Sequence, residues 1–336
     1  MRSNFVQSLK TVAMKAVQIH QTGGPNMLVL SQEAAKPALP LSAGHILVRN
    51  SFVGVNFIDT YHRSGLYKVP LPYTPGREAS GWVEAVGDDV TSFKVGDRVA
   101  HLSPSCYAEY SSVDSGYAVH LPEEISMEVG ASLLLQGLTA MSLAQIAHKV
   151  QPGEVALVYA AAGGTGQMLV QVCKSLGATV IGITSSTAKA QLVKSAGADH
   201  IITYSTEDIY TRVMEITDGQ GVHVVFDGVG KTSFGTSLSC LRKLGSMLSF
   251  GNASGKVDPI DIMSLTPKQV RLMRPSLFQL VSSPKEFLPL AEACIDLVKS
   301  KKLVVHVSKI YDLADCVQAH EDLESGKTLG KLLLRV

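Results

Sequence analysis

Three glycines lie close together in the segment Ala160-Ala161-Ala162-Gly163-Gly164-Thr165-Gly166. This segment follows a short apolar run, Val155–Tyr159, and precedes a helix-like stretch, Gln167–Leu176. A strand, a glycine turn and a helix in this order form a phosphate-binding corner, because the backbone can approach a pyrophosphate and the helix N-terminus offers free N–H groups. The spacing, A-x-x-G-x-x-G, departs from the usual G-x-G-x-x-G. The pattern favours a dinucleotide site; the alternative is a turn needed only for tight packing of helix on sheet.

The residues after the next apolar run indicate which nucleotide would bind. In a Rossmann unit, an acidic residue at this place usually accepts hydrogen bonds from the adenine ribose of NAD. Here the chain offers hydroxyls such as Ser185 in place of a carboxylate, with Lys189 one turn later and Tyr204 after the third run. Hydroxyls and an ammonium would attract a 2′-phosphate that a carboxylate would repel. We therefore expect NADPH rather than NADH, although Lys189 would also suit a solvated helix position.

The second half of the chain alternates short apolar runs with helical segments. The apolar runs are Val155–Tyr159, Thr179–Ile183, His200–Tyr204, Val222–Phe226 and Met247–Phe250. The helical segments among them include Gln167–Leu176, Thr187–Ala196 and Thr206–Ile216, which begins at a plausible N-cap threonine. Fully apolar strands that alternate with helices predict a parallel sheet covered on both faces. The prediction is a doubly wound α/β fold with ligands at the carboxyl ends of its strands.

The first half, from about residue 14 to 135, is β-rich in its pattern. Short segments separated by Gly, Pro and Asp predict strands, as in Lys15–His20, His45–Asn56, Gly81–Val86 and Arg98–His101. After the doubly wound unit, Ala291–Ser300 and Ala314–Glu324 predict two helices, and Lys331–Val336 predicts a final strand. We expect this last part to pack back on the N-terminal half.

Composition and charge exclude several classes of protein. The chain has 336 residues, 46% of them apolar and 18% charged, with a formal net charge of +1, which fits a globular enzyme and gives no nucleic-acid footprint. No run approaches the ~18 apolar residues of a membrane span. Five widely spaced cysteines predict neither disulfides nor a cysteine-rich zinc site and fit a reducing compartment. Residues 1–13 predict a flexible extension, with a weak mitochondrial leader as the alternative. The expected compartment is therefore the cytoplasm, and the mitochondrion is the alternative.

From about residue 14 the chain resembles the medium-chain dehydrogenase/reductase superfamily and, within it, the zeta-crystallin-type quinone oxidoreductases. The motifs that carry the resemblance are Asn56–Tyr67, Tyr73–Gly81, Val86–Val99, Gly137–Ala140, Phe250–Gly255 and Arg274–Leu277. The resemblance implies a GroES-like catalytic domain, residues 14–138 and 288–336, and a Rossmann NADPH-binding domain with a six-stranded parallel sheet, residues 139–287. It also implies a homodimer joined through the Rossmann sheets.

The resemblance further implies which residues form the site between the two domains. The catalytic group would be Asn56, Tyr61 and Tyr67, whose amide and phenol groups could donate to the carbonyl oxygens of a quinone. The cofactor would contact Asn56, Thr139, Gly163, Gly164, Thr165, Gly166, Ser185, Lys189, Tyr204, Phe250, Gly251, Asn252 and Ser276. Arg274 would contact the substrate or serve the dimer edge.

We expect no metal in this site. Zinc-dependent relatives of the superfamily carry Cys where this chain has Asn56, and His in the segment where it has Arg77. An amide is a poor zinc ligand and a guanidinium cannot be one, since zinc prefers thiolate, imidazole or carboxylate. His62 lies nearby, but one imidazole does not make a site.

The expected function is NADPH-dependent reduction of quinones, in particular ortho-quinones, in the interdomain cleft. The family is known both for one-electron quinone reduction and for reduction of activated double bonds, and the sequence does not decide between electron and hydride transfer. One alternative is an NADPH-dependent alkenal or enone reductase with Tyr61 or Tyr67 as proton donor. Another is an NADPH-binding structural or RNA-binding protein, although the near-neutral charge does not indicate RNA binding.

Overall fold

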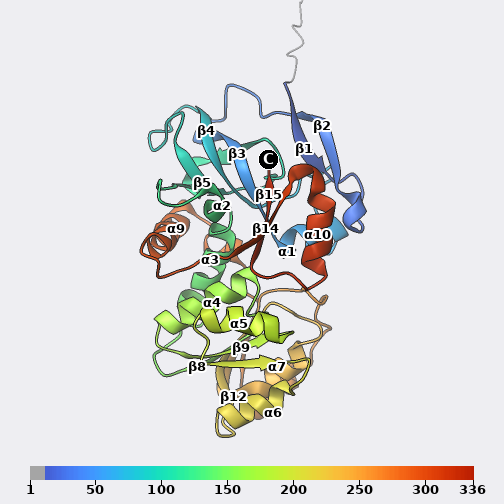
Figure 1. Ribbon diagram of the computed structural model, residues 1–336, viewed down its shortest axis with the longest axis vertical. Helices are drawn as coiled ribbons and strands as arrows, with labels where there is room; N and C mark the ends of the chain where they lie inside the picture. The colour runs from blue at the N-terminus through green and yellow to red at the C-terminus, as the bar shows by residue number, and fades with distance from the viewer. Residues whose placement is uncertain (1–11) are drawn as a thin grey trace, which may run out of the picture.

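Two large β-sheets, one in the upper and one in the lower part of Figure 1, organise the chain. The computed structural model describes residues 12–336. The extension or leader predicted for residues 1–13 therefore lies almost wholly outside the described residues. No helix in the described part combines the length and apolar character needed to cross a bilayer.

The lower sheet has six strands in the order β10-β9-β8-β11-β12-β13, and all its neighbours are parallel. Its strands are β8 (Val155–Val158), β9 (Thr179–Thr184), β10 (His200–Thr203), β11 (Val222–Asp227), β12 (Leu241–Ser249) and β13 (Arg271–Met273). The order reverses between β8 and β11, the place where doubly wound sheets bind ligands. The predicted Rossmann fold with six parallel strands is confirmed.

Helices connect these strands and cover the sheet. They are α4 (Gly164–Ser175), α5 (Thr187–Ser195), α6 (Ile209–Ile216) and α7 (Phe234–Cys240). The prediction that the third of these segments begins at Thr206 is wrong. The helix begins at Ile209, because the carboxylate of Asp208 accepts a hydrogen bond from the backbone N–H of Thr211 and so caps the helix.

The upper sheet has seven strands, six of them in the order β14-β15-β3-β4-β5-β7, with β6 also paired to β3. These strands are β3 (His45–Val55), β4 (Glu78–Val86), β5 (Arg98–Leu102), β6 (Tyr110–Asp114), β7 (Ala118–His120), β14 (Val307–Asp312) and β15 (Lys331–Arg335). A separate antiparallel pair consists of β1 (Ala13–Gln18) and β2 (Val29–Ala35). Since β15 pairs with β3, the final strand returns to the N-terminal half as predicted.

The remaining helices lie around the upper sheet or between the two sheets. They are α1 (Phe57–Ser64), α2 (Met127–Gly130), α3 (Leu134–Met141), α8 (Leu277–Leu280), α9 (Pro284–Lys299) and α10 (Cys316–Glu324). Helix α9 begins seven residues before the predicted Ala291. A capping box between Ser283 and Glu286 starts it, and Pro284 is tolerated because it occupies the first turn.

One continuous apolar core joins the two parts. The largest cluster of buried residues contains Ala100 of β5 and Val158 of β8, and α3 contributes Leu134 and Leu138 between them. All five cysteines are buried free thiols. Helix α3 therefore connects the two sheets through its packing as well as through the sequence. The residue boundaries predicted for the two domains stay a prediction.

Candidate active site

A cavity of about 470 Å³ lies between the two sheets. Both halves of the chain contribute to its walls. Of the residues predicted to form the site, the cavity is lined by Asn56, Tyr61, Tyr67, Thr139, Gly163, Gly164, Thr165, Gly166, Phe250, Gly251 and Ser276. Asn252 lines a neighbouring cavity of about 540 Å³, which shares Tyr67 and Arg274 with the first.

The glycine turn forms one wall, directly after β8. Gly163 is the N-cap of α4, so the first N–H groups of this helix lie at the cavity. A Cβ on Gly166 would lie 2.2 Å from the Ala160 carbonyl oxygen, and one on Gly164 would lie 2.3 Å from Oε1 of Gln136. Close packing against the backbone therefore requires a glycine at 166, whereas a side chain at 164 would have to displace the end of the Gln136 side chain. Ala160, the first residue of the turn, has φ +49°, so it adopts the left-handed conformation that favours glycine.

The residues predicted to bind the 2′-phosphate, Ser185, Lys189 and Tyr204, lie outside the walls of this cavity. Ser185 and Tyr204 follow the carboxyl ends of β9 and β10, and Lys189 lies in the first turn of α5. The backbone N–H of Tyr204 donates to the Thr184 carbonyl at 3.1 Å, which places Tyr204 beside the segment that contains Ser185. The Tyr204 side chain is 56% exposed. The ammonium of Lys189 donates to the carbonyl oxygen of Gly326, and burial lowers its pKa from the usual value.

Two tyrosines from the upper half meet the lower half across the cavity. The Tyr61 hydroxyl accepts a hydrogen bond from the backbone N–H of Asn252 at 2.8 Å. The Tyr67 hydroxyl accepts from Nδ2 of Asn252 at 3.1 Å and from Nη2 of Arg274 at 3.2 Å. Within residues 12–336, neither hydroxyl has an acceptor for its own hydrogen. Burial raises the pKa of Tyr61 to about 12, so its phenol remains protonated at neutral pH.

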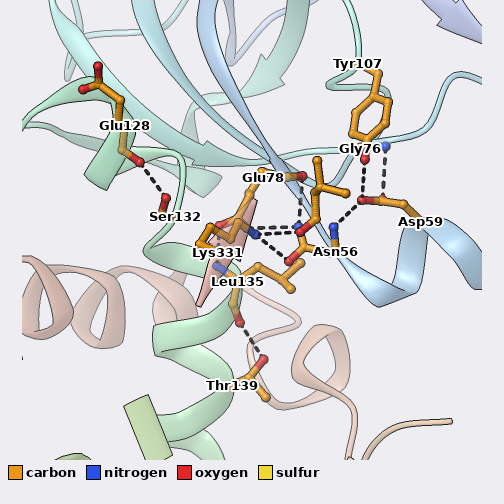
Figure 2. Close-up of polar contacts among 12 residues, drawn as sticks. Asn56, Asp59, Gly76, Glu78, Tyr107, Glu128, Ser132, Leu135, Thr139 and Lys331 are labelled. Atoms are coloured by element: carbon orange, nitrogen blue, oxygen red, sulfur yellow. Dashed lines mark hydrogen bonds and ion pairs between the residues drawn. The ribbon is translucent and has the colours of Figure 1, made fainter. Parts of the chain in front are cut away.

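Asn56 stands at the start of α1, and both polar atoms of its side-chain amide are bound by protein groups (Figure 2). Its Nδ2 donates to the Gly54 carbonyl at 3.1 Å and to Oε1 of Glu78 at 3.0 Å, and its Oδ1 accepts from the ammonium of Lys331 at 2.8 Å. Both amide hydrogens are therefore used inside the protein. Asn56 lines the cavity, and its role as a donor to a quinone stays a prediction, in which one of these internal hydrogen bonds would be exchanged.

Several residues at or near the cavity were not predicted, and among them Glu78, Lys331 and Gln136 are polar and buried. Glu78 and Lys331 form an ion pair at 2.6 Å whose side chains are each 1% exposed. Gln136 is buried in the cavity wall, and its Oε1 has no hydrogen-bond partner in the described part of the chain. The sequence does hold one signal, because Lys331 directly precedes three leucines of the final strand, and a charge is almost never buried unless it is paired.

Asp59 orders the segment that carries the tyrosines. Its carboxylate accepts from the backbone N–H of Asn56 at 2.9 Å, from the backbone N–H of Gly76 at 3.2 Å and from the Tyr107 hydroxyl at 3.2 Å. Burial raises the pKa of Asp59 to about 6 despite these donors. Since every contact is internal, Asp59 fixes the start of α1 and does not face the cavity.

The free polar groups of the cavity suit a polar organic cofactor. Gln136 Oε1, Ser142 Oγ and Tyr159 OH line it without a hydrogen-bond partner among residues 12–336, and buried polar groups normally have one. In the same described part, no three His, Cys, Asp or Glu side chains gather as a metal site. Arg77, in the segment where zinc-dependent relatives carry a histidine, packs its guanidinium carbon 4.2 Å from the centre of the Phe278 ring.

Two family models match the chain. The alcohol dehydrogenase GroES-like domain matches residues 42–130, and the zinc-binding dehydrogenase domain matches residues 164–293. A probable quinone oxidoreductase of Schizosaccharomyces pombe is 39% identical over 321 residues, which are 95% of this chain and 96% of that protein. A 2-haloacrylate reductase of Burkholderia is 37% identical over 330 residues, 95% of this chain and 98% of the other.

Solved structures agree with these matches. The Escherichia coli quinone oxidoreductase complexed with NADPH superimposes with a TM-score of 0.92 at 38% identity, covering 96% of this chain and all of that one. A 2-haloacrylate reductase structure superimposes with a TM-score of 0.82 at 37% identity, and the alignment covers 96% of this chain and 99% of the reductase chain. With the two-sheet fold and the cavity between the sheets, these matches show that the chain belongs to the quinone oxidoreductases of the medium-chain dehydrogenase/reductase superfamily.

Proposed function

We propose that this protein reduces quinones with NADPH. The observation that carries the proposal is the cavity between the sheets, where a glycine turn at a helix N-terminus faces two tyrosine hydroxyls across a space of about 470 Å³. Such a space suits a nicotinamide with a flat substrate against it. The similarity to an NADPH-bound quinone oxidoreductase along almost the whole chain supports the same function.

The cofactor would lie along the lower wall. When bound, NADPH supplies the reducing equivalents. The backbone of Gly163–Gly166 would hold the pyrophosphate at the start of α4, and Ser185, Lys189 and Tyr204 would bind the 2′-phosphate. Near the nicotinamide, Gln136 would satisfy its free Oε1 by accepting from the carboxamide, with Thr139, Phe250, Gly251 and Ser276 around the ring.

The quinone would lie between the nicotinamide and the upper wall. Tyr61 and Tyr67 have hydroxyl hydrogens without an acceptor in the described chain, and these would donate to the quinone oxygens as negative charge develops there. Asn252 and Arg274 donate to the same two hydroxyls and so hold them in place. Asn56 contributes as a fixed part of the wall.

The decisive experiment is the oxidation of NADPH in the presence of phenanthrenequinone, with NADH as the paired control. We expect turnover that is selective for NADPH. Tight NADPH binding without quinone turnover would contradict the proposal. Equal rates with both nucleotides would contradict the roles given to Ser185, Lys189 and Tyr204.

A second candidate is the reduction of an anionic activated alkene. Arg274 lines the cavity and makes no ion pair with a carboxylate in the described part of the chain, and one relative is a 2-haloacrylate reductase. A substrate carboxylate could bind the unused edge of this guanidinium, while Tyr61 or Tyr67 supplies the proton. Turnover of 2-chloroacrylate that is lost in Arg274→Gln would favour this candidate, whereas quinone turnover without activity on the acrylate would reject it.

We also propose that the protein is a homodimer joined through β13. This strand is the edge of the lower sheet, and exposed apolar side chains lie on it or in the segment just before it: Ile260, Ile262, Met263 and Met273. A second copy paired at this edge would cover them. Sedimentation should show a dimer that Met273→Lys weakens. Val304→Lys, an exposed apolar position outside β13, should leave it unchanged.

The compartment that fits best is the cytosol. Five buried thiols without a disulfide suit a reducing environment, and burial raises the pKa of each: Cys106, Cys173, Cys240, Cys294 and Cys316. Fractionation of cells that express the natural gene tests this placement. Recovery in mitochondria would support the leader alternative instead.

A further inference from the structure

Lys331 and Glu78 form a buried ion pair beside the cavity. All three ammonium hydrogens of Lys331 have an acceptor: Glu78 Oε1 at 2.6 Å, Asn56 Oδ1 at 2.8 Å and the Val55 carbonyl at 3.2 Å. The Lys331 and Glu78 side chains are each 1% exposed. A buried ion pair is weak evidence for stability, because desolvation of the charges offsets their attraction. The geometry of this pair gives it another role.

The second oxygen of Glu78 reaches a different element. Its Oε2 accepts the backbone N–H of Leu135 at 2.9 Å, in the first turn of α3 (Figure 2). Glu78 thereby caps the helix that carries Gln136 and Thr139 in the cavity wall. Its Oε1 meanwhile accepts from the amide of Asn56, at the start of the helix that carries Tyr61. One carboxylate thus fixes both helices.

Lys331 extends the same arrangement to the glycine turn. Its neighbour Gly330 donates its backbone N–H to the Ala162 carbonyl at 2.9 Å and forms a β-bridge with Gly163. The Gly330–Lys331 step therefore touches the turn on one side and Asn56 on the other. Three parts of the cavity wall, which are distant in sequence, meet at this one pair.

We propose that the Lys331–Glu78 pair is the positioning unit of the cofactor cleft. It sets Asn56 and the first turn of α3 relative to the glycine turn, so that the nicotinamide and the substrate meet in reactive geometry. Lys331 and Glu78 act through Asn56, Leu135 and Gly330 and are positioning residues. The inference rests on the function proposed above.

The test uses four proteins: wild type, Glu78→Gln, Lys331→Met and the double variant. Glu78→Gln keeps the side-chain volume but replaces one oxygen by an NH₂ group, so either Leu135 or the Asn56–Lys331 side loses its acceptor. Each single variant leaves a buried group without its partner and should lower Tm. The double variant removes both charges and should recover Tm, because no charge stays unpaired.

The expected signature is a separation of stability from catalysis. In the double variant we expect Tm close to wild type, an NADPH Kd within about tenfold, and a kcat with phenanthrenequinone roughly 100-fold lower, as small misplacements in an active site can produce. Recovery of kcat together with Tm would overturn the positioning role. A double variant less stable than either single variant would overturn it too, since the pair would then be a stabilising one.

Two controls separate this inference from the function itself. Lys174→Met makes the same chemical change in a surface ion pair of 2.8 Å with Asp199, in the last turn of α4, and should leave kcat unchanged. The wild type is measured first. Absence of turnover by the wild type rejects the proposed function, whereas turnover in an unimpaired double variant rejects only the positioning role.

Discussion

The two walls of the cavity are built in different ways. The lower wall is made of backbone: the glycine turn brings main-chain N–H groups to the cavity, and a Cβ at Gly166 would collide with the backbone of Ala160. The upper wall is made of side chains, and Asn56 depends on partners in β4 and β15. A site of backbone is local in sequence, whereas a site of side chains is assembled from distant positions.

The two walls should therefore respond differently to substitution. A change in the turn acts through sterics on cofactor binding and folding together. A change in the upper wall acts on individual hydrogen bonds and should alter catalysis more than folding. The five predictions that follow test this contrast.

The largest effect is expected for Gly166→Ala. A Cβ there would lie 2.2 Å from the Ala160 carbonyl oxygen, so the turn must shift. We expect the free energy of unfolding to fall by roughly 3 kcal/mol and NADPH binding to be lost. Urea denaturation and NADPH titration measure both quantities.

Gly163→Ala is the matched control, because a Cβ there meets only the Ala160 carbonyl oxygen, at 3.2 Å, and φ is an ordinary −76°. We expect a loss of stability of at most about 1 kcal/mol. NADPH should still bind more weakly, since a methyl group would enter the pyrophosphate cradle. Wild-type NADPH affinity in both variants would show that the backbone does not hold the phosphates.

Lys189→Ala should change nucleotide selectivity without a change in folding. Loss of a charged hydrogen bond to the 2′-phosphate should raise the Kd for NADPH roughly 10- to 100-fold and leave the Kd for NADH unchanged. Lys194→Ala, an exposed lysine on the same helix, is the control and should affect neither nucleotide. An equal loss for both nucleotides would remove Lys189 from the 2′-phosphate site.

Tyr61→Phe and Tyr67→Phe should each lower kcat/KM for the quinone about tenfold, the value of one hydrogen bond in the site. Their effects should not add, because both hydroxyls accept from Asn252. Tm should change little.

The pH profile tests the state of Tyr61. Burial disfavours its phenolate and raises the pKa to about 12, so the proton is held at every pH well below that value. Activity should not fall between pH 6 and 10 through ionisation of this group. A basic limb near pH 8 that disappears in Tyr61→Phe would contradict this prediction.

The smallest effect is expected for Ala160→Gly, and it should be stabilising. Ala160 has φ +49°, which an alanine adopts at a disadvantage of about 1–2 kcal/mol. Glycine relieves this but gains freedom in the unfolded chain, so a net gain of about 0.5–1 kcal/mol remains. Ala161→Gly, at a buried neighbour, should instead destabilise. Thermal unfolding of the two variants decides the matter.

The sequence is informative where structure is local. The turn at 160–166 and the alternation of parallel strands with helices follow from glycine spacing and apolar runs. Helix ends are predicted less well, because Asp208 and Thr206 are both plausible caps and only the folded backbone selects between them. The ion pair of Glu78 and Lys331 joins residues 253 positions apart, and no pattern of spacing encodes a contact of that range.

The position of β15 has a consequence for the order of folding during synthesis. The Rossmann sheet, β8 to β13, is complete once residue 273 has been made. The upper sheet is not, because β15 lies between β14 and β3 and is synthesised after every other strand in the described chain. The lower half can therefore fold before the upper sheet is complete. The upper half must join β15 to β3 over a long separation in sequence, and the residues that complete the cavity are synthesised last.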